Sequence, residues 1–193
     1  MQPVSRLRRR SSLARSEDEG FTLIELLVVL LIIGILLAIA IPTFLSATQS
    51  AQNTAAQQNL RTALTGSDAF YTSLGGQSYT GIDYTTGGSS TISSIATGLT
   101  YYSGTSSTGP QVVSLWVPAS SSGTALVLTA LAHGSLECWG IVDIKATLGT
   151  AVDHESGIGT YYFVVKNSSP STCAAQTVAP TLANISSSGF PHA

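Results

Sequence analysis

The clearest hydrophobic pattern in this chain is an unbroken apolar run near its amino end. From Leu26 to Ile41 no residue carries a charge or a hydroxyl, and with the apolar residues on either side the run covers residues 21–45. As a helix it would be about 37 Å long at about 1.5 Å per residue, longer than the hydrocarbon core of a bilayer, which is about 30 Å thick. The run predicts a transmembrane helix rather than a buried core helix, because helices that are apolar all round are rare inside small domains.

Beyond Pro42 the pattern changes to that of an amphipathic helix. Apolar residues recur every three to four positions, while the opposite face carries Gln, Asn and Arg61. The residues of the apolar face are Phe44, Ala47, Ala51, Ala55, Leu60, Leu64, Tyr71 and Leu74. We expect this half-helix, residues 46–74, to lie on a sheet.

The rest of the chain predicts a loop followed by strands. Residues 75–110 are rich in Ser, Thr and Gly and predict a surface connection, anchored by Tyr79, Tyr84, Tyr101 and Tyr102. Strand-like runs separated by Gly/Ser turns follow at Val112–Val117, Ala125–Leu131, Leu136–Ile144 and Thr160–Lys166. Four strands packed on the half-helix make one α+β domain, whose sheet lies within residues 111–193. Trp116 and Trp139 are its expected core aromatics.

Charge is scarce and unevenly placed. Only 18 of 193 residues are charged, and five of the six arginines precede residue 16. The positive-inside rule places residues 1–20 in the cytoplasm and the remainder outside. Residues 21–193 hold three basic and seven acidic side chains, which argues against binding to nucleic acid through a basic face. The chain contains no Walker A, G-x-S-x-G or H-E-x-x-H pattern, so we predict no enzymatic activity.

One acidic residue, Glu25, interrupts the apolar run. A carboxylate in a membrane helix costs about 2.5–3.5 kcal/mol or more, so it indicates a functional residue. No Lys or Arg lies between Arg15 and Arg61, and we therefore expect Glu25 to lack an intrachain side-chain partner. A cut close to Glu25 would supply a positive charge in the form of a new amino terminus.

The junction Gly20-Phe21, followed by Thr22-Leu23-Ile24-Glu25, resembles the processing signal of type IV pilins and pseudopilins. The resemblance implies that residues 1–20 are a leader, that a prepilin peptidase cuts after Gly20 and that the new amine of Phe21 is methylated. Gly34 and Pro42 fall where the family often has a helix-loosening Gly and Pro. The implied fold is a long helix packed on a four-stranded antiparallel sheet. This leader departs from the family in ending with three acids, Glu17 to Glu19, rather than with a basic residue.

A structural subunit is the function that the resemblance implies. The chain would start as a membrane precursor with its amino end inside. It would then polymerise with itself into an extracellular pilus for adhesion, motility or surface attachment. The implied partners are the peptidase, an inner-membrane assembly platform and a separate assembly ATPase, and no cofactor is expected. In this scheme the amine at Phe21 of one subunit pairs with Glu25 of another and sets the register.

Three alternatives remain open at this point. The first is a pseudopilin of a type II secretion system or of a DNA-uptake apparatus. The second is an enzyme or lectin tethered by an amino-terminal anchor. The third is an ordinary secretory signal cut after Ala40, at the A-x-A site Ala38-Ile39-Ala40, or a twin-arginine signal at residues 8–10.

Cys138 and Cys173 predict a disulfide, because the domain would lie outside the membrane. A bond closing a loop of this size stabilises by about 3–4 kcal/mol on the loop-entropy model. In the resembling pilins a disulfide bounds a variable carboxy-terminal region. Asp153 and Glu155, with Asp143, are weak candidates for a calcium site. Since ligand spacing of the EF-hand kind is missing, we predict a solvated polar turn and no metal.

Overall fold

One continuous helix, α1 (Leu23–Ala69), begins three residues after Gly20 and includes Pro42. The computed structural model describes residues 20–74, 76–82, 92–149, 157–178 and 185–191. The chain divides into two compact units, residues 1–42 and 43–193. In the first unit the described part of α1 is exposed on every side, as expected for an apolar run without a protein core around it.

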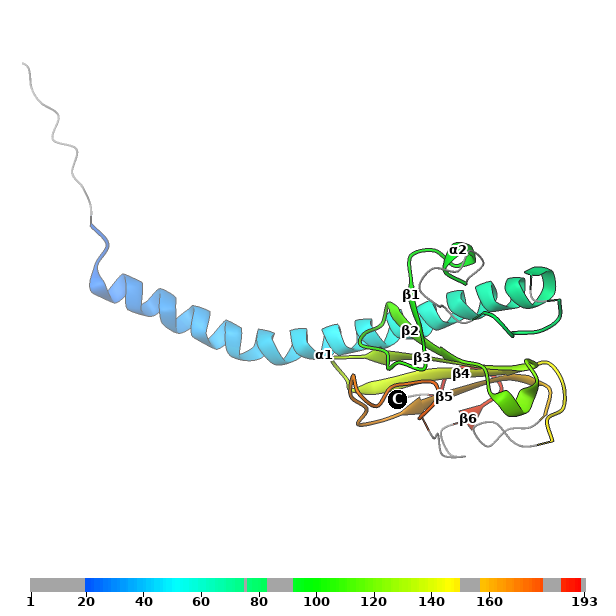
Figure 1. The fold of residues 1–193 in the computed structure, drawn as a ribbon. Helices are drawn as coiled ribbons and strands as arrows, with labels where there is room; N and C mark the ends of the chain where they lie inside the picture. Colours follow the sequence, from blue (N-terminus) through cyan, green and yellow to red (C-terminus); the bar gives the residue numbers. More distant parts are fainter. Residues whose placement is uncertain (1–19, 75, 83–91, 150–156, 179–184, 192–193) are drawn as a thin grey trace, which may run out of the picture. The chain divides into compact units, whose positions relative to one another are not determined.

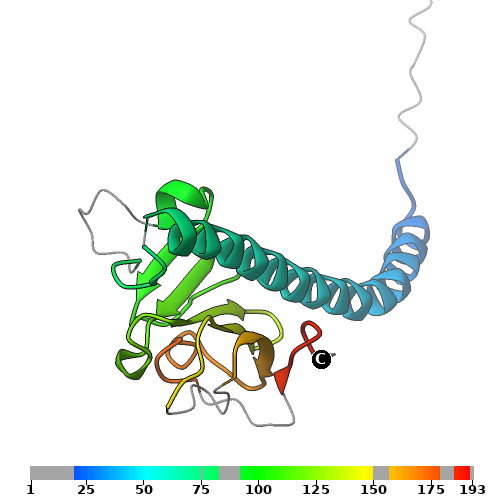
Figure 2. The ribbon, with the colours of Figure 1, turned by 90° about the vertical axis from the view of Figure 1, so that its right-hand side faces the viewer.

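The second unit contains a six-stranded sheet in the order β1-β2-β3-β4-β5-β6 (Figure 1). Its strands are β1 (Thr100–Ser103), β2 (Val112–Trp116), β3 (Ala125–Ala132), β4 (Glu137–Ile144), β5 (Gly159–Val165) and β6 (Ile185–Ser186). β1 pairs with β2 in parallel, and the other pairs are antiparallel. The part of α1 beyond Thr43 lies along one face of this sheet (Figures 1 and 2).

The α+β class is confirmed, but the expectation of four strands, all antiparallel, was wrong in two respects. We expected residues 75–110 to be a loop, but they contain β1 and the short helix α2 (Ile92–Ile95). β6 adds a two-residue edge strand after β5. Both added strands are short, so neither has an apolar run long enough to be recognised. The helix also ends differently, because α1 stops at Ala69 and a π-helical turn, η1 (Phe70–Leu74), follows.

Both faces of the sheet are covered, which explains why every residue of β3 and β4 is buried. Alternate residues of these strands face α1 and pack on its buried residues Ala56, Leu60 and Ala63, as Trp139 does. The remaining residues form a second cluster with Cys173, Ala175 and Val178. The segment around Cys173 therefore covers the face opposite α1.

The predicted aromatic anchors differ in burial. Trp139, Tyr79 and Tyr101 are buried, whereas Trp116 is only partly buried and Tyr102 is exposed. Tyr84 lies outside the described residues. Tyr101 is the single buried side chain of β1, and it anchors that strand to the core.

Polar side chains of α1 attach the helix to the turn between β3 and β4. Asn53 donates from Nδ2 to Glu137 Oε2 at 2.7 Å. Its Oδ1 accepts from Ser135 Oγ at 2.5 Å and from Trp139 Nε1 at 3.3 Å. Nearly two turns further on, Asn59 donates to the carbonyl of Pro110 at 2.8 Å. These bonds fix how α1 lies on the sheet.

Gly140 leaves space for the ring of Phe163, its partner across β4 and β5. A Cβ atom at position 140 would lie 2.0 Å from that ring. We expect Gly140→Ala to lower the free energy of unfolding by about 1–3 kcal/mol, because the added Cβ would overlap a fully buried ring, which would have to shift. Denaturant titration followed by tryptophan fluorescence measures this. Gly109→Ala is the control, since nothing lies within 4 Å of its added Cβ. Equal stability of the two variants would contradict the packing argument.

Candidate assembly site

The first turn of α1 is closed by a capping box. Glu25 Oε2 accepts hydrogen bonds from the backbone amide of Thr22 at 2.9 Å and from its hydroxyl at 2.7 Å. The backbone amide of Glu25 in turn lies 3.3 Å from Thr22 Oγ1. Thr22 is the residue before the helix and Glu25 its third residue, which is the reciprocal arrangement that satisfies free amides at a helix start.

The expectation that Glu25 has no intrachain side-chain partner was wrong. That expectation was based on the lack of a nearby Lys or Arg, whereas the partner of Glu25 is the neutral Thr22. The pattern T-x-x-E before an apolar run is a capping-box signature and could have revealed this from the sequence. One carboxylate oxygen, Oε2, carries these bonds, and the whole residue remains exposed.

The surroundings of Glu25 are apolar. Two shallow grooves, of about 370 and 200 Å³, flank it and share Phe21 and Val29 as lining residues. Eighteen large apolar side chains from Phe21 to Leu45 are each at least 45% exposed. An 18-residue window of this helix has a mean hydropathy of 3.2. Such a surface requires lipid or other apolar helices around it.

Gly34 and Pro42 both lie within α1, and the helix does not end at either residue. Pro42 has no amide hydrogen and cannot donate to the carbonyl one turn earlier, so it weakens the helix there. Gly34 has open space around its Cα. Helix loosening at these two positions remains a prediction.

Two comparisons with known proteins bear on this segment. Residues 15–41 match the family model of the prokaryotic N-terminal methylation motif. Over 62 residues the chain is 42% identical to the type IV major pilin protein PilA of Myxococcus xanthus (strain DK1622). That alignment covers 32% of this chain and 28% of the relative. No solved structure is significantly similar to the chain.

The amino-terminal part of this chain is therefore similar to that of a type IV pilin precursor. The methylation motif includes Gly20, Phe21 and Glu25 and extends through most of the apolar run. The chain spans little more than a quarter of its pilin relative, so what the whole protein does is a separate question.

A disulfide joins Cys138 of β4 to Cys173, as predicted, with 5.5 Å between the Cα atoms. Buried hydrogen bonds also hold the segment around Cys173, which covers the sheet face opposite α1. The amide of Ala175 donates to Ser114 Oγ at 3.0 Å, and the amide of Ser107 donates to the carbonyl of Cys173 at 2.8 Å. The bond therefore holds residues 173–175 against the sheet face opposite α1.

Asp143, the described member of the weak metal candidates, is part of an ionic cluster. It accepts hydrogen bonds from the hydroxyls of Tyr79 and Thr160, the latter at 2.8 Å. Lys145 Nζ lies 3.0 Å from Asp143 Oδ2 and 2.7 Å from Asp68 Oδ1. Asp153 and Glu155 lie outside the described residues. Within the described part of the chain no three His, Cys, Asp or Glu side chains are grouped closely enough to hold a metal.

This cluster could not be predicted from the sequence, because Asp68 and Lys145 are 77 residues apart. The cluster ties the end of α1 to the end of β4 and the start of β5. Burial raises the pKa of Tyr79 well above its ordinary value, and the charge of Asp143 raises it further. Partial burial lowers the pKa of Lys145, but its hydrogen bonds and charge contacts with Asp68 and Asp143 outweigh that effect and raise it overall.

These pKa directions predict that the second unit becomes less stable at alkaline pH. Both groups bind their protons more tightly when folded, so their contribution is fully present below about pH 10 and is lost as pH rises further. We expect the free energy of unfolding to decline above about pH 10, measured by urea titration at a series of pH values. Tyr79→Phe should be less stable at neutral pH and should show a shallower alkaline decline. A decline of the same slope in this variant would show that Tyr79 is not responsible.

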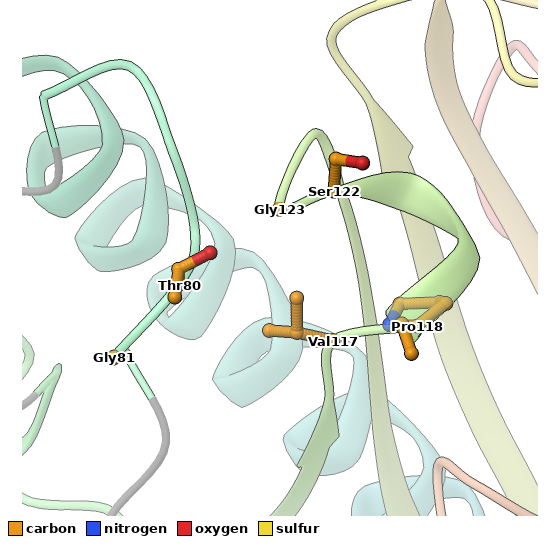
Figure 3. A pocket seen from close by; sticks show the side chains of 7 residues that line it. Thr80, Gly81, Val117, Pro118, Ser122 and Gly123 are labelled. Atoms are coloured by element: carbon orange, nitrogen blue, oxygen red, sulfur yellow. The ribbon is translucent and has the colours of Figure 1, made fainter.

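A shallow cavity of about 360 Å³ lies elsewhere on the second unit (Figure 3). Its described lining includes Thr80, Val117, Pro118 and Ser122. The only side-chain polar groups in this lining are hydroxyls, and none of its residues is acidic, basic or a cysteine. It therefore offers no general acid, general base or activated nucleophile.

Proposed function

We propose that this chain is the precursor of a structural subunit of an extracellular type IV pilus. A prepilin peptidase removes residues 1–20, Phe21 becomes the methylated amino terminus, and residues 21–45 anchor the subunit in the cytoplasmic membrane until it enters a fibre. The observation that carries the proposal is a single carboxylate, Glu25, on a fully exposed apolar helix directly after the Gly20–Phe21 junction.

Assembly follows from the chemistry of that segment. Inside a bundle of such helices the apolar side chains are buried, and the effective dielectric constant around Glu25 falls. The carboxylate then needs a cation, and the basic side chains after the junction, Arg61, Lys145 and Lys166, all lie beyond the apolar run. The amine of Phe21 on a neighbouring subunit fulfils this need and fixes the axial register. Thr22 holds the carboxylate in place before that pairing.

A fibre subunit is preferred to a secretion pseudopilin for two reasons. The relative is named a major pilin, and the Ser- and Thr-rich body is typical of an exposed surface. The remaining partners are the peptidase, an inner-membrane assembly platform and a separate ATPase, since this chain has no nucleotide-binding motif of its own.

The amino terminus of the native protein tests this proposal directly. We expect sheared surface fibres to contain this chain beginning at Phe21, with a mass increase of one methyl group on its amine. Intact-mass and tandem mass spectrometry of the sheared fraction measure both. A chain beginning at Ile41 would replace the proposal with ordinary secretion. A chain beginning at Phe21 but found only in the membrane fraction would contradict fibre assembly and leave the processing step standing.

A further inference from the structure

Exposed apolar side chains lie at the end of the second unit where its chain begins. Among its described residues, the large apolar side chains that remain exposed are Phe44, Leu45, Tyr102, Leu136 and Ile158. Leu45 lies seven positions before Gln52, so both are on one face of α1. Gln52 Oε1 accepts from the amide of Gly134 at 2.5 Å, which brings the turn that contains Leu136 to the same end as Phe44 and Leu45. We call Phe44, Leu45, Leu136 and Lys166 the proximal tip.

The turn that presents Leu136 is held firmly from three sides. Besides Gly134, Ser135 bonds to Asn53, and the carbonyl of Leu136 accepts from the amide of Ser168 at 2.7 Å. Leu136 has a φ of 55°, a conformation that Asn or Gly adopts more readily than Leu. Its side chain is nevertheless 46% exposed. Neither local backbone preference nor the core of this unit therefore explains an apolar residue at this position.

The charge at the proximal tip is positive. The carboxylate of Glu137 is turned inward, where it is buried and bonded to Asn53. Lys166, opposite it at the end of β5, is exposed and has no ion-pair partner within the described part of the chain. The other two acids described in this unit, Asp68 and Asp143, lie at the far end of α1 and β4, about 20 Å away by the rise of either element.

We propose that the proximal tip binds the surface of an anionic phospholipid membrane before the subunit enters a fibre. Leu136, Leu45 and Phe44 would insert among the lipid headgroups, and Lys166 would contact their phosphates. This combination of apolar side chains and a long basic side chain is typical of interfacial binding. The inference rests on the proposed membrane insertion of residues 21–45 but not on fibre formation.

Because the proximal tip is joined directly to the proposed membrane segment, we expect it to contact lipid rather than a second protein. Phe44 and Leu45 are the last residues of the apolar run, so when that run lies in a bilayer the tip begins at the headgroups. Tethering makes this contact effectively intramolecular, and a weak surface is then sufficient. A second copy of the chain would present the same positive tip or the acidic far end, and the latter already has Lys145 between its carboxylates.

The full chain in nanodiscs tests the proposal, with a lipid that carries a gadolinium-chelating headgroup as the probe. One set of discs contains phosphatidylglycerol and phosphatidylcholine, and the other contains phosphatidylcholine alone. We expect strong broadening of the amide signals of Gly134, Leu136 and Lys166 in the anionic discs, weaker broadening in the neutral discs, and little at Asp68 or Lys145 in either.

Leu136→Asn is the informative variant, because Asn suits the backbone at this position. Its unfolding midpoint should equal or exceed that of the parent, while broadening at the turn should fall by at least half. Lys166→Gln should remove the difference between the two disc types. Ile158→Asn, which removes an even more exposed apolar side chain at the far end, should leave both readouts unchanged.

Three results would overturn the proposal in distinguishable ways. If residues 21–45 contact lipid but the turn amides do not broaden, the proximal tip is not a membrane surface, and the proposed membrane anchor stands. If broadening at the turn depends on protein concentration and not on lipid charge, the occupant is a second copy of the chain. If residues 21–45 do not contact lipid, the proposed membrane insertion falls and this inference falls with it.

Discussion

Replacing Glu25 by Gln is expected to abolish fibre formation while leaving the second unit folded. Gln has nearly the same size but no charge, so an incoming subunit can no longer pair with a neighbour's amine at Phe21. Losing one such pair in a low-dielectric bundle costs at least about 1.4 kcal/mol, a tenfold change per contact. We therefore expect the yield of sheared filaments to fall at least about tenfold, measured against membrane-held subunit in cells without the native copy.

Two controls separate assembly from folding and processing. Thr22→Val removes the hydroxyl that bonds to Glu25 but keeps the charge, so it should weaken the helix start without preventing assembly. Far-UV circular dichroism and the Cys138–Cys173 bond should be unchanged in Glu25→Gln, because the second unit begins at Thr43. Normal filament yield with normal cleavage would show that Glu25 does not set the register, whereas accumulation of uncleaved chain would assign it to peptidase recognition.

Removing the disulfide should cause the largest loss of stability. Cys138→Ser combined with Cys173→Ser is expected to lower the free energy of unfolding by about 3–4 kcal/mol, because the bond closes a long loop in the unfolded chain. It also holds residues 173–175 on the sheet. Denaturant titration of the full chain in detergent gives the total effect.

Hydrogen exchange shows where that loss acts. The amides of Cys173 and Ala175 should exchange faster in the double serine variant, while those of α1 between Ala56 and Ala63 should change less. Reduced parent protein is the matched control and should behave like the variant. Two free thiols in carefully alkylated native protein would refute the bond itself.

Features with a long or repeated sequence signal could be predicted. The apolar run gave the exposed part of α1, and the four strand-like runs agree with β2 to β5 within about two residues. The disulfide was predicted from two cysteines and from the expectation that their domain lies outside the membrane. Short elements without such a signal, β1, β6 and α2, were missed, since tertiary packing forms them rather than their own propensity.

Polar contacts between residues far apart in the chain could not be predicted from the sequence. Asn53 meets Ser135 and Glu137 across more than 80 residues, and nothing around Asn53 distinguishes it from the other amides of that helix. The same holds for Asp68 and Lys145. By contrast, the contact of Glu25 with Thr22 is local, and a search for neutral as well as cationic partners would have found it.

The attachment of α1 through Asn53 has a mechanical consequence. If tension enters the second unit through the amino end of α1, it first meets Gln52 and Asn53. Gln52 accepts a hydrogen bond from Gly134 in the turn between β3 and β4, and the three hydrogen bonds of Asn53 reach that turn and the first residues of β4. Asn59 and the buried apolar residues further along the helix take up load only after that. We therefore expect this first anchor, rather than the hydrophobic interface, to determine the force at which the helix begins to peel from the sheet.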